Sequence, residues 1–174
     1  MPLLVLIGGL PGSGKTTLAR KLADTLRLPH LNRDTLYSGY HFTTGERLHP
    51  QANQELLFST ATGLLDGGVS VVLDMTTYRG EMERDVTAGL LSRAYGILVF
   101  TYCEDPRGRF HARMSADPAT TPEQVEAQMA RWPRTQRLAS EPLELDLPLL
   151  RVRTEDGYQP GIDAVAEFVR RGIS

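Results

Sequence analysis

The chain of 174 residues contains little cysteine, lysine or tryptophan. Its one cysteine, Cys103, excludes an intramolecular disulfide, and we therefore expect a protein of the reducing cytoplasm. No apolar run is long enough to span a membrane, and the apolar start lacks the basic segment of a signal peptide. The formal net charge of −2 is not the basic excess typical of nucleic-acid binders.

The most specific motif is the segment Gly9–Thr16, which reads GLPGSGKT. It has two glycines separated by four residues, the second followed by lysine and threonine, as in a phosphate-binding loop. Glycines let successive backbone N–H groups point at an anion, and a following helix adds its positive end. The residues that we expect to bind the nucleotide phosphates here are Gly9, Pro11, Gly12, Ser13, Gly14, Lys15, Thr16 and Thr17.

The surroundings of this motif argue against the alternative, a glycine-rich turn with a chance lysine. Residues 3–7 form a short apolar run that predicts a buried parallel strand. After the loop, Leu18, Leu22 and Leu26 recur every four residues, as on one face of a helix. The motif therefore lies between a strand and a helix, where a phosphate loop belongs, and Lys15 is a candidate catalytic residue that supplies positive charge to the β and γ phosphates.

Strand and helix patterns alternate along the rest of the chain. We predict further strands at residues 28–32, 69–73, 96–103 and 149–152. The predicted helices include residues 51–65, 81–93, 121–138 and a C-terminal helix around 162–169. This alternation favours an α/β fold, a parallel sheet with helices on both faces. We expect a single domain over residues 1–174, with ligands bound beyond the carboxyl ends of the strands.

Asp74 follows the predicted strand of residues 69–73. Phosphate-loop proteins place a carboxylate that holds Mg²⁺ at such a strand end. We expect Asp74 and the Thr16 hydroxyl to be the metal-binding residues, and the alternative is an aspartate that only caps the next turn.

Asp34 lies in the segment Asn32-Arg33-Asp34, just after the second predicted strand. Phosphoryl transfer to a hydroxyl needs a carboxylate that orients the acceptor and takes its proton. Asp34 is our candidate for this catalytic role. The alternative is that Asp34 is the N-cap of a short helix over residues 35–40.

Three arginines follow the fourth predicted strand, and we expect them to lie in a lid of residues 107–121. Arg109 and Arg113 are four residues apart, so a helix would place them on one face. Arginines of a closing lid can offset the charge of the transferred phosphoryl group. Arg113 is the candidate catalytic residue, Arg109 a candidate nucleotide contact, and Arg107 the third arginine; a solvated basic face is the alternative.

With these residues in place, the chain resembles the small P-loop kinases, which include nucleoside-monophosphate-kinase-like and polynucleotide-kinase-like phosphotransferases. The sharpest similarity is to the 5′-kinase domain of phage-type polynucleotide kinase, whose Asn-Arg-Asp element carries a general base that corresponds to Asp34. The resemblance implies a five-stranded parallel sheet of order 2-3-1-4-5 and ATP with Mg²⁺ as cofactors. Tyr37 stands about where the polynucleotide enzyme has a further arginine, and Asp74 is followed by Met75 rather than threonine.

We therefore expect an ATP-dependent phosphotransferase that acts on a hydroxyl of a small metabolite or nucleoside. One alternative is a polynucleotide 5′-hydroxyl kinase, which would make nucleic acid the partner. A second is a nucleotide-binding regulatory ATPase, although the chain has no Asn-Lys-x-Asp guanine signature. The sequence indicates neither the acceptor nor the oligomeric state.

Overall fold

The computed structural model describes residues 1–46 and 49–172. Residues 47–48 and 173–174, which the expected single domain includes, lie outside the described residues, and the single domain stays a prediction. The strands are β1 (Leu3–Gly9), β2 (His30–Asn32), β3 (Val71–Asp74), β4 (Tyr95–Tyr102) and β5 (Leu149–Arg153). The helices are α1 (Lys15–Leu26), α2 (Arg33–Thr44), α3 (Pro50–Asp66), α4 (Glu83–Val86) with a π-helical turn at Thr87–Leu91, α5 (Pro106–Ala116), α6 (Pro122–Ala130), α7 (Trp132–Ala139) and α8 (Ile162–Arg171).

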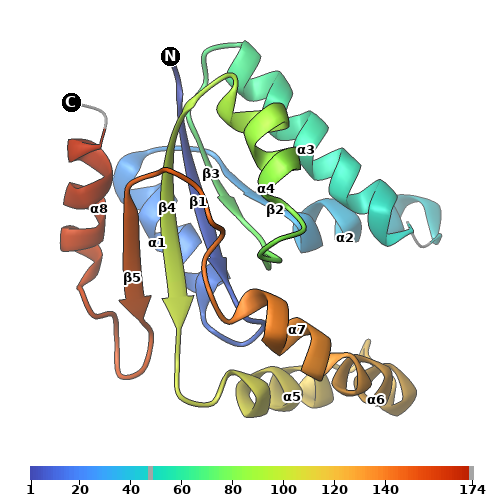
Figure 1. Cartoon of the computed structure of the whole chain (residues 1–174). Coiled ribbons are helices and arrows are strands. Elements are labelled where there is room, and N and C mark those ends of the chain that lie inside the picture. The colour runs from blue at the N-terminus through green and yellow to red at the C-terminus, as the bar shows by residue number, and fades with distance from the viewer. Residues whose placement is uncertain (47–48, 173–174) are drawn as a thin grey trace.

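The five strands form one parallel sheet of order β2-β3-β1-β4-β5 (Figure 1). This order and the parallel pairing confirm the predicted fold. β1 lies in the centre, between β3 and β4, and its carboxyl end leads into the glycine-rich loop. The register pairs Asn32 with Asp74, so two of the predicted site residues lie side by side where β2 and β3 end.

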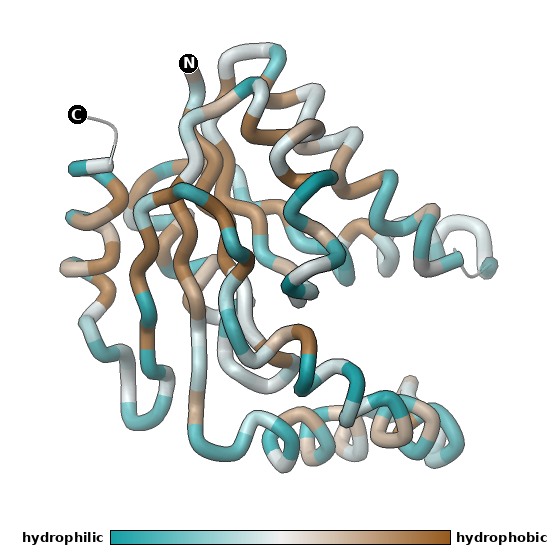
Figure 2. The backbone as a smooth tube through the Cα atoms, in the orientation of Figure 1, coloured by the Kyte–Doolittle hydropathy of each residue, from teal (hydrophilic) through white to brown (hydrophobic). Residues whose placement is uncertain are grey.

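Alternate residues of the strands pack against helices on opposite faces of the sheet, as the 2-residue period of a strand requires. On one face, Val5 and Ile7 of β1 pack with the buried faces of α1 and α8. On the other, Leu4 and Leu6 pack with α3, α4 and the π-helical turn. Figure 2 shows the apolar strands enclosed between these helices. This core holds the carboxyl edge of the sheet rigidly.

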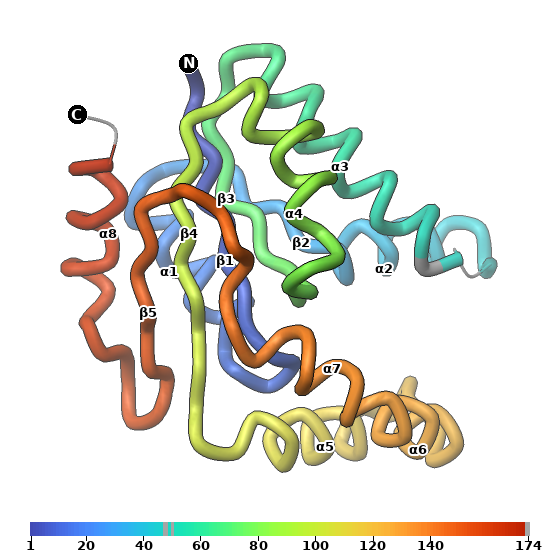
Figure 3. Tube along the Cα trace, viewed as in Figure 1, coloured from blue at the N-terminus to red at the C-terminus, as the bar shows by residue number. Residues whose placement is uncertain are grey.

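The helices α5, α6 and α7 follow one another beyond the carboxyl end of β4 (Figure 3). α7 is joined to the segment after β3, because the backbone N–H of Arg79 donates to the carbonyl of Leu138 at 2.7 Å. Arg134 of α7 also pairs with Glu81 at 2.7 Å. Across the described ranges, no helix combines the length and apolar character needed to cross a membrane.

Two details of the helices differ from the sequence predictions. The helix expected over residues 121–138 is two helices, α6 and α7, divided at Arg131. Pro133 lies in the first turn of α7, where its missing N–H costs least; inside one long helix it would remove a hydrogen bond. In addition, the helix expected over residues 81–93 begins at Glu83 and is π-helical from Thr87 to Leu91.

Candidate active site

The glycine-rich loop has three glycines in the left-handed half of backbone space: φ is 140° at Gly9, 85° at Gly12 and 81° at Gly14. Gly12 also approaches the start of α5, since a Cβ added there would lie 2.1 Å from the carbonyl oxygen of Pro106. Only glycine satisfies both conditions without strain. The loop is therefore tightly curved, with the Ser13 N–H donating to the Leu10 carbonyl at 3.0 Å and α1 beginning directly after the loop.

Buried hydroxyl groups hold this loop against the neighbouring strands. Ser13 Oγ and Thr101 Oγ1 share a hydrogen bond of 2.7 Å, and Thr101 Oγ1 donates to the Gly8 carbonyl at 3.1 Å. On the other side, Thr154 Oγ1 donates to the Ser13 carbonyl at 2.8 Å. Ser13 is thus fully buried and fixes the loop to β4 and to the end of β5. Pro11 lines the cavity described below, and Thr17 is exposed on α1.

Lys15 is the first residue of α1, and its Nζ donates to the Leu10 carbonyl at 3.2 Å. Burial lowers the pKa of this amine to about 8, although Asp74 nearby acts in the opposite direction. Arg113 lowers it further by charge repulsion. The charged Lys15 amine is destabilised by burial and by repulsion from Arg113. A bound anion would compensate both of these effects.

Asp74 is fully buried and hydrogen-bonded from three sides. Thr16 Oγ1 donates to Oδ2 at 2.7 Å, Asn32 Nδ2 donates to both oxygens, and the His30 ring contacts Oδ1. Burial alone would raise the pKa of Asp74, but the hydrogen bonds from His30, Thr16 and Asn32 hold it below its usual range. The carboxylate is therefore charged, oriented and adjacent to the Thr16 hydroxyl.

Asp34 is not the cap of the following helix. Asn32 is the N-cap of α2, because its Oδ1 accepts hydrogen bonds from the backbone N–H groups of Asp34 and Thr35 at 2.9 and 3.1 Å. The Asp34 carboxylate stays exposed, and Arg33 Nε lies 3.8 Å from it. The structure thus contradicts the capping alternative and leaves the Asp34 carboxylate free to act on a ligand.

The three arginines of the expected lid lie on α5 and differ in what they face. Arg113 reaches toward Lys15 and stacks over the Phe110 ring at 5.4 Å. Arg109 points the other way, to Thr154 Oγ1 at 3.4 Å, on the β5 side of the glycine-rich loop. Arg107 is exposed. Of the three, only Arg113 lines the cavity that contains Asp34.

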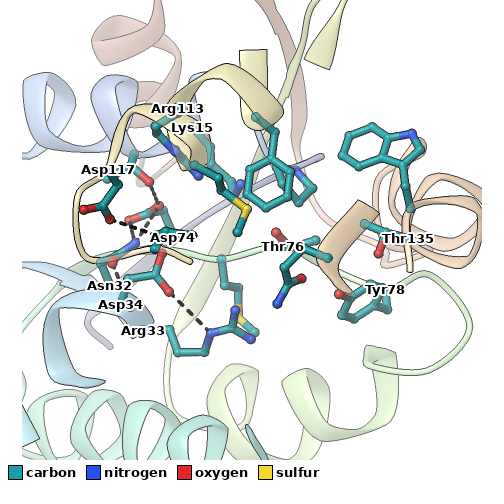
Figure 4. Close-up of a pocket in the computed structure, with 18 residues that line it drawn as sticks. Lys15, Asn32, Arg33, Asp34, Asp74, Thr76, Tyr78, Arg113, Asp117 and Thr135 are labelled. Carbon is teal, nitrogen blue, oxygen red and sulfur yellow. Dashed lines mark hydrogen bonds and ion pairs between the residues drawn. The ribbon is translucent and has the colours of Figure 1, made fainter. Parts of the chain in front are cut away.

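These residues surround a cavity of about 410 Å³ at the carboxyl edge of the sheet. Figure 4 shows Lys15 and Arg113 near Asp74 and Asn32, with Asp34 and Arg33 beside them. Tyr78 and Thr135 lie at its far end. Six of the sequence-predicted residues line this one cavity: Pro11, Lys15, Thr16, Asp34, Asp74 and Arg113.

Several residues of the site were missed from the sequence. His30 contacts Asp74. The sequence indicates this position only through the 2-residue period of a strand, because His30 lies two residues before Asn32 and therefore on the same face of β2. Phe110 and Trp132 stack with ring centroids 6.1 Å apart and line the cavity. Trp132 is buried and also forms part of the wall.

The residues present fit a nucleotide with Mg²⁺. A hydroxyl and a charged carboxylate, Thr16 and Asp74, lie 2.7 Å apart and offer the oxygen ligands that Mg²⁺ prefers. Among the described residues there is no group of three His, Cys, Asp or Glu side chains that could hold a metal by themselves.

The family model AAA_33, described as an AAA domain, matches residues 4–142. Among solved structures, a candidate kinase from Chloroflexus aurantiacus is 24% identical, with a TM-score of 0.74 over 99% of this chain and 96% of that one. The APS kinase of Mycobacterium tuberculosis, solved with AMPPNP and APS, is 21% identical, with a TM-score of 0.60 over 99% and 97%. A gluconokinase from Sinorhizobium meliloti is 15% identical, with a TM-score of 0.54 over 98% and 90%.

A comparison with curated protein sequences finds no match. The structural similarities, all below 25% identity, concern the fold. The family model, by contrast, covers most of the chain, including the glycine-rich loop, Asp34, Asp74 and the arginines of α5. The chain therefore belongs to the AAA_33 family and is a kinase-like P-loop domain.

Proposed function

We propose that this protein transfers the γ-phosphoryl group of ATP to a hydroxyl group of a small metabolite or nucleoside. The observation that carries the proposal is the exposed carboxylate of Asp34, which lines the same cavity as Lys15, Asp74 and Arg113. A nucleotide-binding switch has no use for a free carboxylate beside the phosphate site, whereas a kinase needs one to receive the acceptor's proton.

In this proposal, Asp34 orients the acceptor hydroxyl and takes its proton as the oxygen forms a bond to the γ phosphorus. The bond from that phosphorus to the β–γ bridging oxygen breaks, and ADP leaves with the negative charge. Lys15 and Arg113 offset the charge on the phosphoryl oxygens, mainly by positioning and electrostatics. Mg²⁺, when bound by Thr16 and Asp74, would neutralise phosphate charge.

The nucleotide contacts belong to the glycine-rich loop. We assign the backbone N–H groups of Gly12 and Gly14 to the phosphates, with Gly9 and Pro11 shaping the turn and Thr17 following on α1. The Ser13 N–H donates to the Leu10 carbonyl at 3.0 Å, so Ser13 takes part by fixing the loop. Arg109 lies beside Thr154 on the β5 side of the loop, outside the cavity of Asp34. We therefore assign Arg109 to the nucleotide and Arg113 to the transferred phosphoryl group.

A polynucleotide 5′-hydroxyl kinase is the second candidate. A second, larger cavity of about 1030 Å³ continues from the first past Arg33 and Asp34. That volume supports an acceptor larger than a simple sugar. The chain also matches part of an RNA repair complex, at 21% identity and a TM-score of 0.58 over 81% of this chain and 47% of that one.

The test is transfer of label from γ-labelled ATP, with Mg²⁺, to a pool of nucleosides, sugars, sugar acids and a 5′-hydroxyl oligonucleotide. We expect label on a small molecule, and Asp34→Asn to lower the rate by about 10²–10⁴-fold with AMPPNP affinity unchanged. Asp24→Asn, an exposed carboxylate on α1, is the matched control. Label on the oligonucleotide would favour the second candidate, and ATP loss without label on any acceptor would contradict the proposal.

A further inference from the structure

The cavity that contains Asp34 opens into a groove between two parts of the molecule. The groove has a volume of about 1030 Å³ and shares Arg33, Asp34 and Tyr78 with the smaller cavity. One wall comes from α2 and α3 and the other from α6 and α7. In Figure 3, α2 and α3 lie above α6 and α7. An acceptor whose hydroxyl reaches Asp34 must place the rest of its structure in this groove.

Of the three arginines that line the groove, two are paired, Arg33 with Asp34 at 3.8 Å and Arg134 with Glu81. Arg33, Arg131 and Arg134 line the groove, and Asp34 is the only carboxylate among the lining residues that the structure describes. Arg134 is neutralised by Glu81, which its guanidinium contacts at 2.7 and 2.8 Å. Arg131 forms no ion pair with any described residue. A cation therefore stays available on the wall opposite Asp34.

Asn53 adds a second, independent sign of a ligand. It lies on α3, the residue is 7% exposed, and it lines the groove. Its Oδ1 is buried and has no hydrogen-bond partner among the described residues. A buried amide oxygen without a donor is costly and uncommon in folded proteins. A hydroxyl or amino group of a bound acceptor would supply the missing donor.

We infer that the acceptor is a small hydroxy compound that also carries an anionic group, a carboxylate or a phosphate. Arg131, assisted by Arg33, binds this group while Asn53 accepts a hydrogen bond from a polar group of the same molecule. The inference rests on the proposed function, since it concerns the acceptor of that reaction. It excludes cationic acceptors such as aminoglycosides, which the arginines would repel.

The test is a binding measurement, so that it does not depend on turnover. The glycine-rich loop is first saturated with AMPPNP and Mg²⁺, because an empty loop would itself bind anions. Calorimetric titrations then compare D-gluconate with D-glucose, and adenosine 3′-phosphate with adenosine. The charged member of at least one pair should bind about 10–100-fold more tightly, the range of a charge-assisted hydrogen bond.

Variants connect this preference to the groove. Arg131→Gln should reduce the ratio of the two affinities within the preferred pair to about one. Asn53→Ala should weaken the binding of both members of that pair equally. Arg137→Gln, an exposed arginine of α7 outside the groove, is the matched control and should leave the preference unchanged. Circular dichroism of each variant checks that it is folded.

Equal affinity within both pairs, no binding of either charged compound, or a preference that survives Arg131→Gln would overturn the inference. Tighter binding of a 5′-hydroxyl oligonucleotide than of adenosine 3′-phosphate would also overturn it, in favour of a nucleic-acid strand. The transfer assay separates these failures from that of the proposed function. Label on a neutral acceptor would support the proposed function and contradict the requirement for an anionic group. No transfer to any acceptor would contradict the proposed function itself.

Discussion

Asn32 Nδ2 donates hydrogen bonds to both carboxylate oxygens of Asp74, at 2.9 Å to each. The same side chain caps α2 through Oδ1, so one amide joins the proposed metal-binding carboxylate to the helix that begins beside Asp34. The two functions use the two ends of the amide group. The carboxylate at the end of β3 and the proposed base at the start of α2 are therefore fixed relative to each other by a single residue.

Replacement of Asn32 should consequently be more costly than loss of an ordinary helix cap. Asn32→Ala removes the cap and also removes a donor that the buried Asp74 carboxylate shares between its two oxygens, leaving Thr16 and His30 as its remaining contacts. It should lower the free energy of unfolding by about 2–4 kcal/mol. Thr121→Ala, which removes the N-cap of the exposed helix α6, should cost only about 1 kcal/mol. Urea denaturation measures both variants, and equal costs would contradict the double role of Asn32.

Gly12 should tolerate no side chain. Its φ of 85° is strained for any residue with a Cβ. A Cβ at this position would also lie only 2.1 Å from the Pro106 carbonyl oxygen. Gly12→Ala should lower stability by about 2–5 kcal/mol and abolish binding of AMPPNP. Gly39→Ala, in α2 with nothing near its Cβ position, is the control and should be neutral or slightly stabilising. Thermal unfolding and calorimetry test both, and normal AMPPNP binding by Gly12→Ala would argue against the phosphate loop.

Lys15 should give nucleotide binding a distinctive pH dependence. Burial lowers its pKa to about 8, below the usual 10.5, so the folded protein loses this proton at a pH where the unfolded chain keeps it. Burial of the charged amine therefore lowers the free energy of unfolding by its full amount below pH 8. This destabilisation decreases as the pH rises above 8. Phosphate binds the charged amine, so AMPPNP affinity without Mg²⁺ should fall by about tenfold per pH unit above pH 8.

Lys15→Met is the control for this pH effect. It should bind AMPPNP weakly at every pH, without the decline above pH 8, and it should be more stable than the wild type below pH 8. Titration calorimetry between pH 7 and pH 10 gives the slopes. An identical slope in Lys15→Met would assign the titration to another group.

Arg113 should affect transfer more than nucleotide binding. It lines the cavity with Lys15 and Asp34, where we propose that charge develops on the transferred phosphoryl group. Arg113→Gln should lower the rate of transfer by about 10²–10³-fold with little change in ATP affinity. Arg107→Gln, an exposed neighbour on the same helix, is the matched control. Steady-state kinetics compare the two, and equal rates would remove Arg113 from the proposed machinery.

Much of this architecture could be predicted because its signals are local. The glycines of the loop, the apolar run of β1 and the leucine repeat of α1 each follow from chain geometry. The sheet order came from the resemblance, and the structure confirms it. The assignments of Asp34, Asp74 and Arg113 stay predictions, although the structure brings these three residues to one cavity.

The remainder depends on contacts between distant residues, which a single sequence does not show. The contact of His30 with Asp74 requires knowing that β2 lies next to β3. The division between α6 and α7 has a local signal in Pro133, but this single residue lies inside an otherwise helical pattern. Asn53 of α3 gave no signal at all, because its position in the groove depends on how α3 packs on the sheet.

The helix α2 contributes no buried side chain to the protein. Its Tyr37 lines the groove, while Phe42 is 90% exposed. Because no side chain of α2 is fully buried, although Leu36 packs partly against the core, substitutions at its positions that face the groove should cost less stability than substitutions in the core. Its amide hydrogens should also exchange with solvent faster than those of α1. Substitutions in this one helix are therefore a route by which the proposed acceptor can change while the carboxyl edge of the sheet stays the same.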